Sequence, residues 1–437
     1  MSFLNKIFDC CFRSKEFKLH PKIEKEFEEE KEVSKNAKDK EKEIKSSKTP
    51  QDKGTSEITK DKGTPENSKD KEKKSLETIK DTPKDKNELS PIGSSEENFS
   101  ALNATLQCLS NINELTNYFR GTFPKIPEYE KKVLSYKYYK LIQNLENENS
   151  NNKISHSSLI EFKEKLSEIN AFLSKQVEIN SVDLFITLLS NLHGELNINK
   201  SNGNSINHSN NQNYNEAISF KVFSDDQKVK NNSIIFNLFS LVSENINKCT
   251  NCYIQQYNFS ILYNIEFHLK TVNEFLINYG MRNNYNMSSN QKPSIHIAEC
   301  FQYYNGNYGL NSQMFCNNCL NEIDHITQNN LYSLPKYLII NFNRGFDYDI
   351  FDYNVIFPDL LNLDMFAKEN SSNTKLELFA VICDTKESSS EKHFVAYCKN
   401  QENKNWYLYD SDNISSCENP STNHKGMVYI LFYKAFL

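Results

Sequence analysis

Hydrophobic residues recur at helical spacing from about residue 100 onward. The first run places apolar side chains three, four or seven residues apart, at Leu102, Leu106, Leu109, Ile112 and Phe119. The same period continues over 133–142, 159–173 and 182–196. Because side chains at this spacing share one face of a helix, these segments are predicted to be amphipathic helices.

Beyond Phe236 the pattern changes to short apolar and aromatic runs, which are typical of strands. These runs cover 253–267, 337–342, 376–383, 393–398, 406–409 and 427–433. Two Asn-rich stretches, 197–215 and 278–290, lack periodicity and are interpreted as surface insertions. Helices followed by strands predict an α+β fold.

Residues 13–89 differ from the rest of the chain. Lys, Glu, Asp, Ser and Thr dominate them, and Asp52-Lys53-Gly54-Thr55 recurs at 61–64. Such a segment cannot bury enough apolar surface to fold, so it is predicted to be a disordered, charged, low-complexity tail ahead of a folded region at 90–437. The mixed charges fit a solvated spacer or a docking segment.

Residues 1–12 form a short apolar terminus that contains Cys10 and Cys11. Adjacent cysteines beside basic residues are candidates for palmitoylation, which would give weak, reversible membrane association. The alternative is a short frayed terminus.

Composition narrows the class of protein. The 437 residues include 29 Phe and 23 Tyr, too many for a wholly disordered chain, and the net charge is -6, so no nucleic acid is expected as a partner. The chain shows no signal peptide and no apolar stretch of about 18 residues. Eleven cysteines then indicate thiols or metal ligands in a reducing compartment, the cytoplasm or the nucleus.

Four of the cysteines form two C-x2-C pairs, Cys249 with Cys252 and Cys316 with Cys319. Each pair can present two thiolates from one tight turn, and two pairs complete the tetrahedral shell of a structural Zn²⁺ ion. A closed shell leaves no position for a reacting water, so the expected metal is structural. Coincidental buried cysteines and a nucleic-acid-binding ribbon are the alternatives.

A second constellation lies near the C-terminus. His393 begins one predicted strand and Asp410 ends the next. If the two strands form a hairpin, the carboxylate can orient the imidazole, which is what a thiol or hydroxyl nucleophile requires of its base. A histidine with only a structural hydrogen bond is the alternative.

Several blocks in order resemble the catalytic domain of the ubiquitin-specific proteases. Residues 98–109 (NFSALNATLQCL) are similar to the family's Cys box, 334–344 to its L-P-x-x-L-I-I-x-x-x-R strand and 357–358 to its F-P. Residues 378–381, 393–397, 406–410 and 429–433 resemble its His box and closing strand. The resemblance implies a papain-like fold with a helical thumb at about 98–230, zinc-binding fingers at about 240–335 and a β palm at about 336–437.

The resemblance also implies roles for individual residues. His393 falls at the general base, Asp410 at the residue that orients it, and Asn98 at the side chain that stabilises the oxyanion. The nucleophile position holds Ser100 where the family has Cys. A hydroxyl cannot be pre-ionised by a neighbouring imidazolium as a thiol can, so catalysis is expected to be weak or absent. Ser is also a preferred helix N-cap, which is an alternative use of Ser100.

Other positions depart from the family as well. Glu97 and the pair Glu391-Lys392 stand where glycines make room for the thin C-terminal tail of ubiquitin, and 180–185 is a degraded form of the Q-D-x-x-E-F helix. These side chains would obstruct the tunnel for that tail.

Three functions are therefore compatible with the sequence. The first is a monomeric pseudoprotease that binds ubiquitin or ubiquitinated proteins, whereas active members of the family hydrolyse ubiquitin C-terminal isopeptide bonds. The second is an active deubiquitinase that uses Ser100, His393 and Asp410. The third is an interaction module for a partner other than ubiquitin on an inherited fold.

Overall fold

The structure is a computed structural model that describes residues 99–145, 154, 156–169, 181–199, 215–280, 292–306, 309–345, 351–368, 374–385, 392–411 and 413–436. All of these belong to the second of two units, Asn87–Leu437. The predicted tail at 13–89, Cys10 and Cys11, and Asn98 lie outside the described residues.

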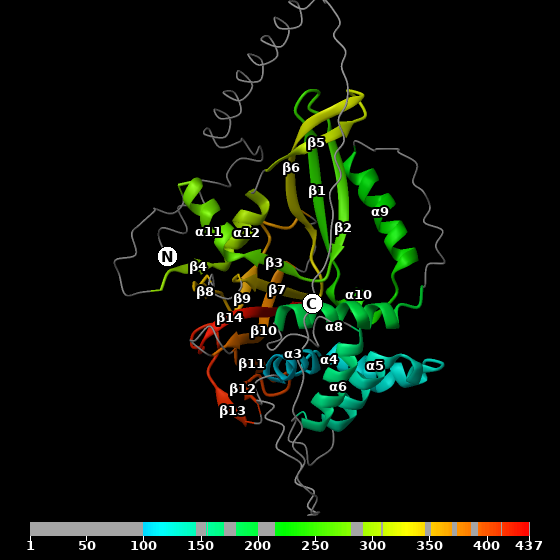
Figure 1. Ribbon diagram of the computed structural model, residues 1–437, viewed down its shortest axis with the longest axis vertical. Helices are drawn as coiled ribbons and strands as arrows, with labels where there is room; N and C mark the ends of the chain where they lie inside the picture. Colours follow the sequence, from blue (N-terminus) through cyan, green and yellow to red (C-terminus); the bar gives the residue numbers. More distant parts are fainter. Residues whose placement is uncertain are drawn as a thin grey trace, which may run out of the picture. The chain divides into compact units, whose positions relative to one another are not determined.

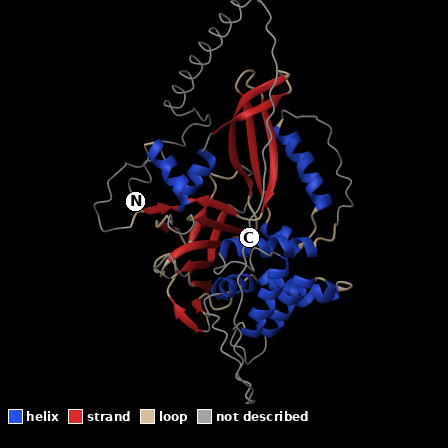
Figure 2. Ribbon diagram, in the orientation of Figure 1, coloured by secondary structure: helices blue, strands red, loops and turns tan. Residues whose placement is uncertain are grey.

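The first part of the unit is helical, as the periodicity predicts (Figure 2). Its elements are α3 (Ser100–Ser110), α4 (Asn113–Gly121), η2 (Phe123–Lys125), η3 (Tyr129–Lys131), α5 (Val133–Leu145), α6 (His156–Ile169), α8 (Ser181–Leu196), α9 (Glu216–Lys230) and α10 (Ile234–Phe239).

The first apolar run forms two helices, α3 and α4, which meet at a turn that polar side chains hold. Asn111 Nδ2 donates to the carbonyl of Lys399 at 2.9 Å, and Thr116 Oγ1 donates to the carbonyl of Ser110 at 2.8 Å. Ile112, between the helices, has extended φ and ψ of -89° and 98°. The Thr116 hydroxyl thus gives a carbonyl at the end of α3 a partner outside the helix, and Asn111 anchors the turn to the strand that ends at Lys399.

An eight-stranded sheet forms the other half of the core. Its order is β13-β12-β11-β10-β14-β7-β3, and β9 also pairs with β10. The strands are β3 (Ile265–His268), β7 (Tyr337–Asn343), β9 (Leu360–Asn362), β10 (Lys375–Asp384), β11 (Phe394–Lys399), β12 (Trp406–Asp410), β13 (Asn413–Cys417) and β14 (Met427–Ala435). The pairings are antiparallel except that β3 runs parallel to β7.

Both faces of this sheet are buried, which explains its nearly continuous apolar strands. Successive residues of β7 point to opposite faces, so Ile339 packs with the core under α3 and α8, and Ile340 packs with the core under α11 (Leu269–Asn278) and α12 (Ile297–Gly306). A strand that is covered on both sides needs apolar residues at every position. A small parallel pair, β4 (Ser294–His296) and β8 (Asn354–Ile356), adjoins the sheet through β14.

A separate four-stranded antiparallel sheet extends from this core (Figure 1). Its order is β2-β1-β6-β5, with β1 (Leu241–Cys249), β2 (Gln255–Leu262), β5 (Gly309–Cys316) and β6 (Asn321–Ser333). Helix α9 packs on it through Phe220, whose ring centroid lies 4.2 Å from that of Tyr332. The turns β1–β2 and β5–β6 carry the two C-x2-C pairs.

The simple order of helices before strands is only partly right. Helices α10, α11 and α12 lie beyond residue 233, and the predicted strand 253–267 is divided into β2 and β3 around Tyr263. Each of these helices has fewer than eleven residues, so its period is hard to separate from that of a buried strand. No helix in the described part of the chain is long and apolar enough to cross a membrane.

A close backbone contact at the end of β10 gives a testable result. Gly426 has φ +83°, and a Cβ there would lie 2.0 Å from the carbonyl oxygen of Asp384. Gly426→Ala is therefore expected to destabilise the fold by about 2–5 kcal/mol in urea unfolding, from the left-handed backbone and the clash together.

Gly194 provides the matched control, because it is an exposed residue of helix α8 with no atom within 4 Å of its added Cβ. Gly194→Ala is expected to stabilise by about 0.5–1 kcal/mol, since alanine loses less backbone entropy in a helix. Equal effects at the two positions would contradict this account.

Candidate functional site

Ser100 lies at the start of α3 and contacts strand β11. Its side chain is buried, with 3% of the residue exposed, and Ser100 Oγ accepts a hydrogen bond from the backbone N–H of Phe394 at 3.1 Å. Phe394 directly follows His393. The fold thus brings the predicted nucleophile position next to the predicted base, although Ser100 and His393 are 293 positions apart in the sequence.

The N-cap interpretation of Ser100 is wrong. The N-cap of α3 is Phe99, with φ -108° and ψ -10°, and no side chain caps the helix. Ser100 is the first helical residue, so its side chain points across to β11 and does not cap its own helix.

This contact predicts a structural cost for removing the hydroxyl. Ser100→Ala leaves the buried Phe394 N–H without that acceptor, and the expected loss is about 1–3 kcal/mol in the free energy of unfolding. Ser110→Ala is the control on the same helix, because the partly buried Ser110 hydroxyl only donates to Gln107 one turn earlier. A smaller loss of unfolding free energy for Ser100→Ala than for Ser110→Ala would exclude a stabilising Ser100–Phe394 hydrogen bond between α3 and β11.

His393 and Asp410 meet as the hairpin predicts. His393 Nε2 lies 2.6 Å from Asp410 Oδ1, and the two side chains are 20% and 44% exposed. Strand β11 pairs with β12 in antiparallel register from Ala396 opposite Tyr409, which places the start of one strand beside the end of the other. Since Nε2 is engaged by the carboxylate, Nδ1 is the ring nitrogen left for a reacting group.

Asparagine side chains hold α3 against this hairpin. Asn103 Nδ2 donates to the carbonyl of Ser411, the residue after Asp410, at 2.9 Å. Asn111 makes the corresponding contact with Lys399 at the far end of the helix. The helix and the two strands are therefore tied together at both ends, and this fixes Ser100, His393 and Asp410 in one region.

Two residues that the sequence pattern did not indicate hold the backbone of His393. Its N–H donates to Asp384 Oδ1 at 3.1 Å, and its carbonyl accepts from the N–H of Thr385 at 2.9 Å. An acidic residue at the end of a strand has no periodic signature, and only the pairing of β10 with β11 identifies its partner.

Of the three residues predicted to obstruct the tunnel, the structure describes Lys392. Lys392 is half-buried, and its Nζ lies 5.4 Å from the centroid of the Tyr429 ring. Its positive charge also opposes the rise in the pKa of Asp183 that burial and Glu266 cause. Glu97 and Glu391 lie outside the described residues, as does Asn98.

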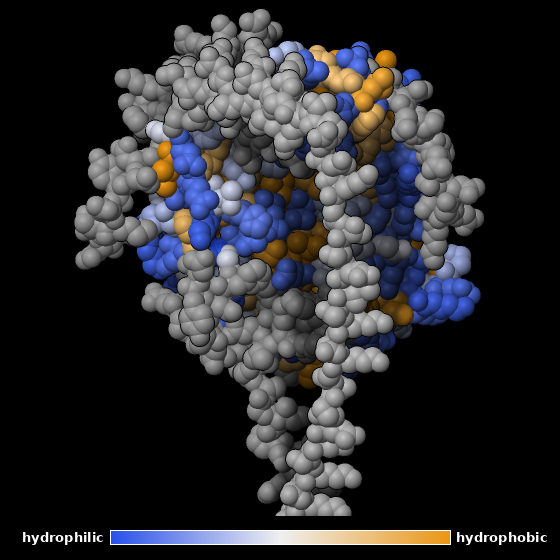
Figure 3. Space-filling view, turned by 45° about the horizontal axis from the view of Figure 1, so that its top comes forward, coloured by the Kyte–Doolittle hydropathy of each residue, from blue (hydrophilic) through white to orange (hydrophobic). Residues whose placement is uncertain are grey.

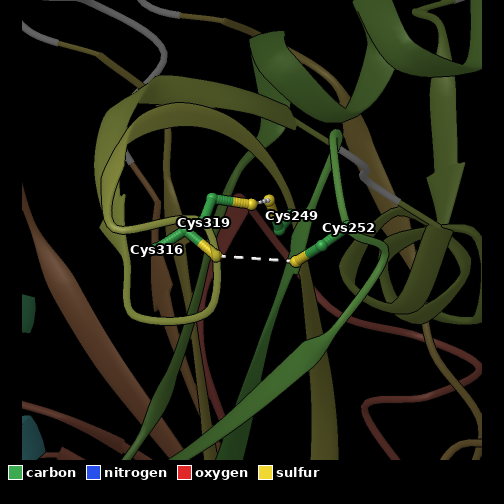
Figure 4. Close-up of side chains that lie close together, drawn as sticks. All are labelled: Cys249, Cys252, Cys316 and Cys319. Atoms are coloured by element: carbon green, nitrogen blue, oxygen red, sulfur yellow. Dashed lines mark hydrogen bonds between the residues drawn. The ribbon is translucent and has the colours of Figure 1, made fainter.

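The four cysteines of the two pairs come together at the end of the four-stranded sheet (Figure 4). Their sulfur atoms all lie within 4.8 Å of one another, with Sγ–Sγ distances of 3.9 Å between Cys249 and Cys319 and 3.6 Å between Cys252 and Cys316. A tetrahedron with metal–sulfur bonds of about 2.3 Å has edges of about 3.8 Å. The four cysteines could therefore bind a metal ion.

The charge preferences of these thiols agree with a cation site. Burial alone would raise the pKa of Cys252, but hydrogen bonds from the Ile254 backbone and the neighbouring thiols lower it to about 7. At Cys319 the Asn251 side chain lowers the pKa, yet burial and the other three thiols raise it to about 12. Ionisation of one thiol is thus favoured, and ionisation of the others is disfavoured because the thiolates would repel one another. A bound cation would remove this repulsion.

Exposed apolar side chains surround this cluster. Tyr253, Phe315 and Leu320 are 53%, 55% and 77% exposed, and apolar residues gather at this end of the molecule in the upper right of Figure 3. Tyr253 and Leu320 each follow the second cysteine of a pair and have positive φ, 61° and 53°. These non-glycine residues hold the left-handed turn at a cost of about 1–2 kcal/mol each.

Comparison with known proteins identifies the family. The family model described as "Ubiquitin carboxyl-terminal hydrolase" matches residues 95–433, which is most of the chain and includes both clusters. The chain belongs to the ubiquitin carboxyl-terminal hydrolase family. Its architecture and the order of its motifs are those expected of a ubiquitin-specific protease.

Curated members of the family are distant relatives. Ubiquitin carboxyl-terminal hydrolase 4 of Bos taurus is 27% identical over 153 residues, 33% of this chain and 16% of that protein. Ubiquitin carboxyl-terminal hydrolase 15 of Homo sapiens is 26% identical over 153 residues, 33% of this chain and 15% of that protein. The match thus spans about a sixth of the length of these larger hydrolases.

Solved structures share the fold of this protein. The SAGA DUB module of Ubp8, Sgf11, Sus1 and Sgf73 bound to monoubiquitin aligns with a TM-score of 0.56 at 15% identity, over 78% of this chain and 67% of that one. The same module bound to ubiquitin aldehyde aligns with a TM-score of 0.53 at 16% identity, over 78% and 68%. At this identity the likeness shows the fold alone.

Proposed function

We propose that this protein is a ubiquitin-binding member of the family in which hydrolysis of ubiquitin C-terminal isopeptide bonds is weak or absent. In this proposal Ser100 occupies the nucleophile position, His393 is the base, Asp410 orients it and Asn98 contributes to the oxyanion site. The observation that carries the proposal is the buried contact of Ser100 Oγ with the Phe394 N–H.

The chemistry of that contact disfavours attack on a carbonyl. A thiol of pKa about 8.5 can be ionised in advance by an imidazolium and a helix N-terminus, whereas a hydroxyl must lose its proton during the attack itself. The Ser100 oxygen also accepts a hydrogen bond from Phe394, which lowers its basicity and anchors it in place. The site therefore retains a base and its orienting carboxylate but lacks an activated nucleophile.

The four-stranded sheet supports the binding part of the proposal. Its exposed tip residues, Tyr253, Phe315 and Leu320, offer apolar surface that a folded partner such as ubiquitin can cover. We assign Zn²⁺ to the four cysteines, because thiolate ligands in a closed tetrahedral set suit a structural zinc ion. All nine described cysteines are free, which suits the reducing environment of the cytoplasm or the nucleus.

The second candidate is a working hydrolase that uses Ser100. The 2.6 Å contact of His393 with Asp410 favours it, because a retained pair of base and orienting carboxylate is what activates a serine in other hydrolases. A nucleophile activated in this way would depend strictly on His393.

One set of measurements separates these candidates. Calorimetry with ubiquitin and turnover of a fluorogenic ubiquitin C-terminal amide are compared for the wild type and for His393→Ala. Binding without turnover in both is the expected result. Turnover by the wild type that disappears in His393→Ala would establish the second candidate, and absence of both binding and turnover would leave a module for another partner.

A further inference from the structure

Three consecutive backbone groups around His393 are each held by a different residue. The His393 N–H donates to Asp384 Oδ1 at 3.1 Å, and the His393 carbonyl accepts from Thr385 N–H at 2.9 Å and from Thr385 Oγ1 at 3.2 Å. The next N–H, of Phe394, donates to Ser100 Oγ. With the backbone held, the His393 side chain can move only by rotation about its own bonds, and the contact of Nε2 with Asp410 fixes that rotation.

Asp384 is itself fixed on three sides. It ends β10, where it lies opposite Phe394 of β11 and opposite Met427 of β14, and it is 2% exposed. Gly426 approaches its carbonyl so closely that no side chain fits there. The carboxylate oxygen that meets the His393 N–H is therefore presented by a rigid part of the sheet.

A buried cation balances the charge in this region. Arg344 is 2% exposed, and its guanidinium donates to the carbonyls of Val428, Phe351 and Tyr353, at 2.7–3.2 Å. Burial lowers the pKa of Arg344, and negative charge on Asp384 is among the effects that oppose this. A carboxylate inside the sheet is tolerable because this guanidinium lies within electrostatic reach.

We propose that Asp384 is a positioning residue that sets the place of the His393 imidazole through the backbone of His393. The inference rests on the proposed function only in taking His393 as the base. Asp384 supplies an oxygen acceptor that fixes the N–H of His393, and the ring then reaches Asp410 on one side and leaves its other nitrogen toward the region of Ser100.

The test follows His393 directly, in the full chain without ubiquitin. Protein labelled with ¹⁵N-histidine gives one set of imidazole signals per histidine, and loss of a set in His393→Gln identifies the signals of His393. Amide hydrogen exchange at His393 is measured in the same samples. The variants are Asp384→Ala, which removes the acceptor, and Asp384→Asn, which keeps an oxygen at that position.

Asp384→Ala is expected to speed exchange of the His393 amide by about tenfold, the change that corresponds to loss of one hydrogen bond. The same variant should move the His393 imidazole signals toward those of a solvated histidine. Asp384→Asn is expected to restore both. Asp364→Ala is the control, because the Asp364 carboxylate accepts a hydrogen bond from Thr374, which precedes the opposite end of β10 from Asp384.

Several results would overturn the proposal. His393 imidazole signals that do not change in Asp384→Ala would mean that Asp384 does not position the ring. Shifts in Asp384→Asn as large as those in Asp384→Ala would exclude the role of Asp384 as an oxygen acceptor. If Asp384→Ala does not fold, the wild type still provides a test, because fast exchange of its His393 amide would by itself overturn the proposal. None of these readouts involves ubiquitin or position 100, so failure here is distinct from failure of the proposed function.

Discussion

Ser100→Cys is expected to convert the protein into one that reacts covalently with ubiquitin carrying a C-terminal electrophile, whereas the wild type is not labelled. A thiol at the first residue of α3 is stabilised as thiolate by the helix N-terminus and by the imidazolium of His393. Turnover of a ubiquitin C-terminal amide should rise by about a thousandfold or more, as expected when a missing nucleophile is restored. Mass spectrometry and fluorescence measure the two effects.

Two controls define what that gain means. Adding His393→Ala to Ser100→Cys should abolish turnover, because the base is then missing. Ser110→Cys, at the other end of α3, should not be labelled, since a thiol there faces neither His393 nor the helix N-terminus. A folded Ser100→Cys variant that binds ubiquitin but is not labelled would show that another residue closes the site, with Lys392 the first to examine.

Removal of the metal site is expected to give the largest loss of stability. Binding of structural zinc contributes on the order of 10 kcal/mol in isolated finger peptides, and here it would join the turns β1–β2 and β5–β6. Cys252→Ser should reduce bound zinc from about one ion per chain to a small fraction and lower the urea midpoint. Strong chelators should do the same to the wild type.

Cys417→Ser is the matched control for that variant. Cys417 is also a partly buried free cysteine, but it lies in β13 of the eight-stranded sheet, away from the cluster. It should keep the zinc content of the wild type. The zinc assignment would be refuted if wild-type protein refolded with zinc contains none. It would also be refuted if Cys252→Ser does not change the stability.

Secondary structure was predictable where the period is long or the strand is fully buried. The helices at 133–142 and 182–196 and the strands at 337–342 and 427–433 correspond to α5, α8, β7 and β14. Helices α11 and α12 were not predicted, because each has ten residues and their apolar faces are short. The turn between α3 and α4 is held by Asn111, which bonds Lys399, and by Thr116, which bonds Ser110, and the first of these contacts joins residues that are 288 positions apart.

The candidate site also combines a part that local strand pairing explains, His393 and Asp410, with a part that depends on tertiary packing, Ser100. His393 and Asp410 are on neighbouring strands of one hairpin, so short-range pairing is enough to bring them together. Ser100 reaches the same place only because α3 packs across β11, with its hydroxyl on Phe394. Family resemblance indicated Ser100 at that position, but the N-cap role that local preference favoured was wrong.

The amino-acid sequence by itself determined the α+β class, the two C-x2-C pairs and the hairpin that carries His393 and Asp410, because each follows from periodicity or spacing over a few residues. Only the tertiary structure decided that the cysteine pairs converge, that Ser100 Oγ binds the Phe394 N–H, and that Asp384 holds the backbone of His393. These contacts join segments through strand register and helix packing, and the free energy of burying both faces of the sheet selects that arrangement.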